Sequence, residues 1–146
     1  MNKEEEMNKE LLLSRLSEAL REGTLGKTWS ILAILYLAYI QRKGRGGMTA
    51  GDIVKVMKKL GYDLDKKEFY GLVSRWKKEG FVESIRVSGG RKTRVIYKIN
   101  ADKEFDVERA LCERLEKSGY VVDRVDPEEV LEMIGKKGNH GHKRLF

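Results

Sequence analysis

Hydrophobic residues recur at helical spacing through most of the chain, and they alternate with polar residues in two short stretches. The helical spacing predicts helices over 3–22, 27–42, 50–60, 66–79 and 102–118. Asp126-Pro127 followed by two acids indicates the start of one more helix. Alternation predicts two strands over 81–87 and 94–99, joined by a turn at Ser88-Gly89-Gly90. We therefore expect a mainly α-helical (α+β) fold with one small antiparallel β-hairpin.

Local signals mark the boundaries of the central elements. Thr49 followed by Asp52, and Asp65 followed by Glu68, have the spacing of helix N-terminal caps. The run GRGG at 44–47 indicates a flexible break before the first of these caps. On the hairpin, apolar residues share one side of each strand: Phe81, Ile85 and Val87 on the first, and Val95, Tyr97 and Ile99 on the second.

The segment 27–42 is the most apolar part of the chain. Its apolar run is too short to cross a bilayer, which requires about 20 residues. Apolar residues occupy nearly every face of this segment, so a buried helix here must be covered on two sides. Its own core would cover one side, and the N-terminal helix, a partner subunit or both would cover the other. Lining of an effector pocket would explain the segment as well as packing does.

The chain of 146 residues is long enough for one domain with helical extensions, and 36% of its residues are charged. Abundant Lys and Glu with few Asn and Gln are typical of heat-adapted proteins. The one cysteine, Cys112, excludes an intramolecular disulfide and fits a reducing, cytoplasmic compartment. Its position at the apolar edge of a helix favours a packing role over redox sensing. The polar, acidic N-terminus does not resemble a signal peptide.

The positive charge is concentrated in one unit. Residues 66–98 contain ten Lys or Arg and three acids, a net charge of +7 that equals the net charge of the whole chain. The remaining residues are therefore neutral in sum. A focused positive charge on one helix and hairpin favours a polyanionic partner, most commonly nucleic acid.

Three stretches resemble a winged helix-turn-helix domain of the MarR/PadR kind of transcription regulator: MTAGDIVKVMKKLG (48–61), FYGLVSRWKKEGFVES (69–84) and IRVSGGRKTRVIYKIN (85–100). The resemblance implies a DNA-binding domain over 25–100, with a dimerising or packing helix in 1–24 and a helical extension in 101–146. It also implies that the helices over 3–22 and 102–118 form a homodimer. Leucine stripes and the apolar 27–42 helix suggest the interface residues Leu12, Leu16, Leu20, Tyr36, Leu111 and Leu115.

An α-helix fits the major groove of DNA, and long side chains on its outer face reach base edges there. The outer face of the 66–79 helix gives the candidates for base readout: Lys67, Tyr70, Ser74 and Arg75. Arginine is the strongest of these, because its fork pairs with guanine O6 and N7 together. The candidates for backbone contact are Thr49, Lys66, Lys77, Lys78, Arg86, Arg91, Lys92 and Arg94.

Other functions have weaker support. No nucleophile, base and orienting group occur in combination, so we expect neither an enzyme nor a cofactor. His140 and His142 offer too few ligands for a metal site. The main alternative is a winged-helix adaptor that binds another protein of the transcription or replication machinery, because fold alone does not fix function. The sequence leaves open whether the protein activates or represses and whether it senses an effector.

Overall fold

The computed structural model describes residues 3–122 and 127–138. Its helices are α1 (Lys3–Glu22), α2 (Gly26–Gln41), α3 (Ala50–Lys59), α4 (Lys66–Lys78), α5 (Glu104–Lys117) and α6 (Pro127–Gly138), and a short 3-10 turn (Ala101–Lys103) precedes α5. Its strands are β1 (Gly47–Met48), β2 (Val82–Gly89) and β3 (Lys92–Ile99). They form one antiparallel sheet in the order β1-β3-β2. This is the arrangement of a winged helix-turn-helix domain, so the predicted fold class is confirmed.

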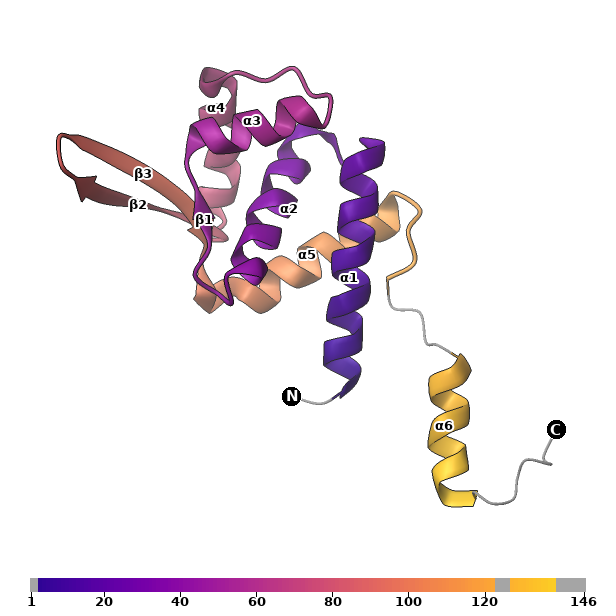
Figure 1. Ribbon diagram of the computed structural model, residues 1–146. Helices are drawn as coiled ribbons and strands as arrows, with labels where there is room; N and C mark the ends of the chain where they lie inside the picture. Colours follow the sequence, from indigo (N-terminus) through magenta and orange to yellow (C-terminus); the bar gives the residue numbers. More distant parts are fainter. Residues whose placement is uncertain (1–2, 123–126, 139–146) are drawn as a thin grey trace.

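The apolar helix α2 runs through the middle of the helices, and it contacts α1, α3, α4, α5, β1 and β3 (Figure 1). Every residue from Ser30 to Tyr36 is buried. The one polar residue of this run, Ser30, donates a hydrogen bond to the Tyr62 hydroxyl at 3.1 Å, which satisfies its buried oxygen. The apolar pattern of α2 requires that a second side of the helix be shielded from water. Helices α1 and α5 of the same chain provide this shielding.

The predicted caps are present at both helices of the helix-turn-helix. The Thr49 hydroxyl accepts a hydrogen bond from the Asp52 amide at 3.1 Å, and the Asp65 carboxylate accepts one from the Glu68 amide at 2.8 Å. Each cap satisfies an amide that the first helical turn leaves without a partner. These local bonds fix where α3 and α4 begin.

Two glycines of the 44–47 stretch, which was expected to be a flexible break, are needed for close packing. A Cβ on Gly46 would lie 2.1 Å from the Ala38 carbonyl oxygen. A Cβ on Gly47 would lie 2.5 Å from Cγ2 of Ile96 and 2.8 Å from the Tyr97 carbonyl oxygen. Glycine therefore lets the chain pass the end of α2 and pair with β3 at distances that no other residue permits.

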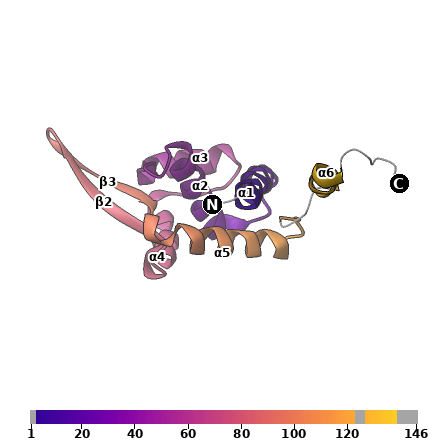
Figure 2. The same cartoon turned by 90° about the horizontal axis from the view of Figure 1, so that it is seen from below.

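The hairpin is longer than predicted and presents the opposite side of β2 to the core. The ladder extends to the pair Gly89–Lys92, which leaves Gly90 (φ 65°) and Arg91 as the turn. Val82 is buried opposite Ile99, whereas Ile85 and Val87 are exposed. The hairpin extends away from the helices as a wing (Figure 2).

Candidate nucleic-acid interface

Helix α4 is held against the core along one side. Phe69, Val73 and Trp76 are buried, and the Trp76 indole Nε1 donates a hydrogen bond to the Thr28 carbonyl at the start of α2, at 2.8 Å. The Phe69 ring packs edge-on against the Tyr97 ring of β3, with 5.1 Å between centroids. These contacts tie α4 to both α2 and the sheet. They also set the rotation of α4 about its axis, so that its opposite side faces outward.

We call the row of residues on that opposite side the outer row of α4: Lys67, Gly71, Ser74 and Lys78. The spacing of four, three and four residues places them along one line of the helix surface. Lys67 and Lys78 are exposed and form no ion pair with another described residue. The Ser74 hydroxyl donates to the Gly71 carbonyl at 2.7 Å, so this side chain lies close to the helix surface.

Arg75 lies on the flank of α4 that faces α2. Its guanidinium carbon is 4.7 Å from the centre of the Trp76 ring and 5.4 Å from that of Trp29, and its Nε is 3.7 Å from the Glu79 carboxylate. Cation–π contacts and the carboxylate therefore hold this side chain against the domain. The structure does not bring Arg75 together with Tyr70, the other candidate for base readout outside the outer row.

Tyr70 lies on the other flank of α4, beside an open cleft of about 580 Å³. The cleft joins the start of α3, the start of α4 and the strand β3. It is lined by Thr49, Ala50, Gly51, Asp52, Lys66, Tyr70, Thr93, Arg94, Val95 and Tyr97. Four residues predicted separately from the sequence therefore meet in one place: Thr49, Lys66, Tyr70 and Arg94.

The charge of this cleft is positive at one wall. A Cβ on Gly51 would lie 3.8 Å from the Lys66 Nζ, so the lysine ammonium lies close to the start of α3. The first amides of a helix point outward without partners and carry partial positive charge. Lys66 and Arg94 add two full positive charges against the single carboxylate of Asp52. Such a combination suits an anion.

The wing carries basic residues on both of its faces. Residues paired across an antiparallel ladder point to the same face. Arg86, paired with Val95, therefore lies on the same face as the buried Tyr97, whereas Arg94, paired with Val87, lies on the opposite face together with Lys92. Arg91 occupies the turn. All four basic side chains are exposed, as is Lys77 near the end of α4.

The six leucine and tyrosine side chains predicted to form a dimer interface lie in the core of the single chain. Their exposed fractions do not exceed 5%: Leu12, Leu16, Leu20, Tyr36, Leu111 and Leu115. As placed, none of them reaches a surface on which a second copy could dock. The stripes pack α1, α2 and α5 against one another within the chain.

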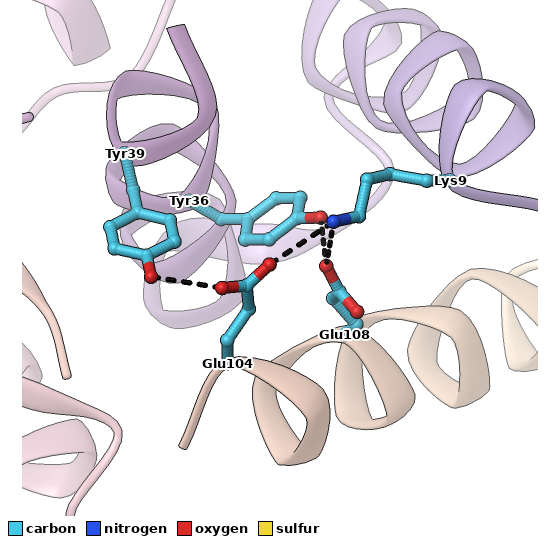
Figure 3. Close-up of polar contacts among 5 residues, drawn as sticks. All are labelled: Lys9, Tyr36, Tyr39, Glu104 and Glu108. Carbon is cyan, nitrogen blue, oxygen red and sulfur yellow. Dashed lines mark hydrogen bonds and ion pairs between the residues drawn. The ribbon is translucent and has the colours of Figure 1, made fainter. Parts of the chain in front are cut away.

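A polar cluster closes one side of this helical core (Figure 3). The Tyr36 hydroxyl donates to Glu108 at 2.6 Å, and the Tyr39 hydroxyl donates to Glu104 at 2.9 Å. The Lys9 ammonium lies 3.1 Å from Glu104 and 3.3 Å from Glu108. The cluster therefore ties α1 and α2 to α5.

Burial and these bonds shift the acidities of the cluster. Burial, followed by the hydrogen bond to Glu104, raises the pKa of Tyr39 to about 12. Burial alone would raise the pKa of Glu104, but the bonds from Lys9 and Tyr39 outweigh it and hold that pKa below its ordinary value. Burial would likewise lower the pKa of Lys9, but the two carboxylates raise it above its ordinary value. Each group is therefore held in its usual charge state.

The other candidate chemistry of the chain has little support in the structure. Among residues 3–122 and 127–138, no three His, Cys, Asp or Glu side chains are grouped as metal ligands would be. His140 and His142 lie outside the described residues. Cys112 is half-buried and packs against the core. None of the described helices combines the length and apolar character needed to cross a membrane.

The sequence alone indicates only part of the cleft. Thr49 is a backbone-contact candidate because it caps the start of a helix, and Lys66, Tyr70 and Arg94 are candidates by charge or by position. The sequence gives no sign that Thr93 and Tyr97 lie beside them. The pairing of β1 with β3, which brings β3 beside the start of α3, joins Gly47 to Lys98 and Met48 to Tyr97 and has no local signal.

No family model matches the chain, and no curated protein matches it. Among solved structures, the chain is similar to the crystal structure of a PadR family transcriptional regulator from Eggerthella lenta DSM 2243. The two sequences are 20% identical, the match covers 88% of this chain and 93% of that chain, and the TM-score is 0.46. The function proposed for this chain rests on its own residues and geometry.

Proposed function

We propose that the chain is a sequence-specific, double-stranded-DNA-binding transcription regulator that acts as a homodimer. One observation carries the proposal: the outer row of α4 and the cleft beside it expose Lys66, Lys67, Lys78 and Arg94, and none of these forms an ion pair with another described residue. Unpaired cations gathered on one helix and the adjoining cleft favour a polyanion.

Helix α4 is the element that would enter the major groove. Its inner side is committed to the core through Phe69 and Trp76. Its two outer-row lysines form no ion pair with another described residue, and a Cβ on Gly71 would meet nothing within 4 Å. Lys67, Tyr70 and Ser74 are the proposed base readers. Arg75 could reach the bases only by giving up its cation–π contacts with Trp29 and Trp76. We therefore expect it to contribute less to base readout than the other three residues.

The cleft would hold a phosphate of the DNA backbone. The start of α3 beside Thr49, Lys66 with its ammonium near Gly51, and Arg94 of β3 all line it. Phosphate contacts of this kind fix the position of a protein on the duplex without reading its sequence. Lys77 and Lys78 would contact the backbone from the end of α4.

The wing would lie along the backbone or in the minor groove beside the site that α4 occupies. Arg91 lies in the turn at the tip of the hairpin, and Lys92 and Arg94 share one face of the hairpin. Arg86 lies on the other face. The wing cannot present both of its faces equally to the same DNA strand. We therefore expect these residues to contribute unequally to the affinity for DNA.

Dimerisation would use α6. Its side chains Val130, Leu131, Met133 and Ile134 are exposed to between 43% and 65% and lie on one side of the helix. An isolated helix of 12 residues is only marginally stable in water, so α6 needs a partner surface to persist. A second copy supplies an identical apolar stripe, which a two-fold interface pairs with itself. Such a dimer would present two α4 helices to a pseudo-palindromic site.

The dimer is tested by light scattering on Met133→Asp. We expect the wild-type chain to be a dimer and the variant to be a monomer, because the charge would enter the paired stripe. Glu132→Gln is the matched control, since Glu132 lies on the opposite side of the same helix. A wild-type monomer, or a dimer in both variants, would refute the use of α6.

DNA binding is tested by titrating the protein into a pool of labelled duplexes at two salt concentrations. We expect a subset of duplexes to be retained at the higher salt, because base contacts persist when phosphate contacts are screened. Loss of all duplexes in parallel would leave only sequence-independent binding.

A protein-docking adaptor is the second candidate function, and one observation favours it. The exposed fractions of Ile85 and Val87 on the wing are 40% and 48%. A phosphate backbone gains nothing from aliphatic side chains, whereas a protein partner does. Absence of duplex selection together with intact folding would support this candidate.

A further inference from the structure

Gly71 lies in the middle of the outer row of α4, and nothing within the fold accounts for it. A Cβ built on Gly71 has nothing within 4 Å, so no neighbour excludes a side chain there. Gly71 is not among the residues with positive φ, so its backbone conformation does not require glycine either. Apart from proline, glycine is the residue least favourable to a helix interior. The helix therefore loses stability at this position without a packing or conformational reason.

The surroundings of Gly71 point to a partner that approaches the helix closely. Lys67 and Lys78 lie on the same row, about 16 Å apart along the helix axis. Between them the surface is low, because the Ser74 hydroxyl bends back to the Gly71 carbonyl. Glycine is the residue that permits close approach of a backbone to a ligand. The outer row therefore has a long cationic side chain at each end and no side chain in the middle. This shape suits the floor and rims of the major groove.

We propose that Gly71 sets the depth at which α4 enters the major groove, by allowing the helix backbone to contact base edges directly. This inference rests on the proposed DNA-binding function and adds a residue to it. Lys78 reaches a phosphate on the rim of the groove, while Lys67 and the bare surface at Gly71 meet the bases. A side chain at this position holds the helix away from the groove floor, which weakens the contacts of Tyr70 and Ser74 with the bases.

The test compares Gly71→Ala and Gly71→Leu with the wild-type chain by thermal unfolding and by binding to the duplex that the wild type selects. Because alanine and leucine favour helices, we expect the midpoint of unfolding to rise by about 3 °C in each variant. Affinity for the selected duplex should fall about tenfold with alanine and further with leucine. Affinity for a scrambled duplex should change much less, because the lysines that contact phosphates remain.

Ser14→Ala is the matched control, since it improves helix propensity at an exposed position of α1, outside the proposed interface. It should raise the unfolding midpoint without changing affinity. An equal loss of affinity in this control would trace the effect to helix stability and overturn the proposal. So would unchanged affinity in both Gly71 variants, or a lowered unfolding midpoint in Gly71→Ala. A wild-type chain that selects no duplex refutes the proposed function itself, whereas selection that tolerates Gly71→Leu refutes this inference alone.

Discussion

The Trp76 indole of α4 donates a hydrogen bond to the backbone carbonyl of Thr28 in α2, at 2.8 Å, and this bond decides which side of α4 faces outward. Trp76 is fully buried, its ring stacks on Phe81, and its edge meets Trp29 with 4.7 Å between centroids. A rotation of α4 about its axis would break all three contacts. The outer row and the cleft beside it depend on this anchor.

Trp76→Phe should therefore destabilise the fold and weaken DNA binding together. The substitution removes the indole donor to the Thr28 carbonyl and opens a small cavity, at a cost of about 2 kcal/mol in the free energy of unfolding. Urea denaturation measures this loss. Trp29→Phe is the control, because Trp29 is half-buried and has no such bond to Thr28, and it should cost less than about 1 kcal/mol. Equal costs for the two variants would contradict the role of the bond.

Arg75→Ala should change duplex selectivity less than Lys67→Ala. Arg75 is engaged by Trp29, Trp76 and Glu79 in the free protein, so its removal should lower stability by less than about 1 kcal/mol. Lys67 lies on the outer row without an acid partner among the described residues. Binding to a panel of single-base variants of the selected duplex measures both effects. If Arg75→Ala alone erased the preference at one base pair, by about 1–3 kcal/mol, Arg75 would be a principal reader after all.

Lys66→Ala and Arg94→Ala should each weaken binding to all duplexes by a similar factor. Both residues line the proposed phosphate site, and each phosphate contact contributes about −0.9 to the slope of log K against log salt. Titration at several salt concentrations should therefore give a shallower slope for each variant. Lys117→Ala, an exposed change on α5, should leave the slope unaltered. A cleft variant that keeps the wild-type slope would remove that residue from the phosphate site.

Glu104→Gln should flatten the loss of stability in acid. The pKa of Glu104 is lowered in the folded state from an ordinary value of 4.5, despite burial, by the bonds from Lys9 and Tyr39. A carboxyl group with a lowered folded pKa stabilises the fold above its unfolded pKa, and this stabilisation is lost as the pH falls through the folded value. Urea denaturation between pH 6 and about pH 3 should show a shallower decline in the variant. Glu113→Gln, also on α5, is the control, and a decline as shallow as that of Glu104→Gln would contradict the assignment.

The helices and their starts were predictable because their signals are local. Thr49 and Asp65 cap amides three residues away, and proline at 127 begins α6 as expected. Periodicity also identified α2 as a helix that must be covered on two sides. Such features involve residues close in the chain, so the sequence contains all the information that they need.

Features that depend on distant contacts have no local signal in the sequence. Apolar residues occur on both sides of β2, and only the pairing of Val82 with Ile99 shows which side is buried. The leucine stripes of α1 and α5 pack on each other within the chain, but a stripe looks the same whether its partner is the same chain or a second copy. Helical spacing alone places Arg75 on the flank of α4, but its contact with the Trp29 ring has no local signal, because it joins residues of two different helices.

The most direct test of the central claim is selection of bound duplexes from a random pool by the wild-type chain. The proposed function predicts enrichment of one pseudo-palindromic motif whose half-sites are about one helical turn, roughly 34 Å, apart. Recovery of duplexes without a common motif, with affinity that depends on salt alone, would contradict it.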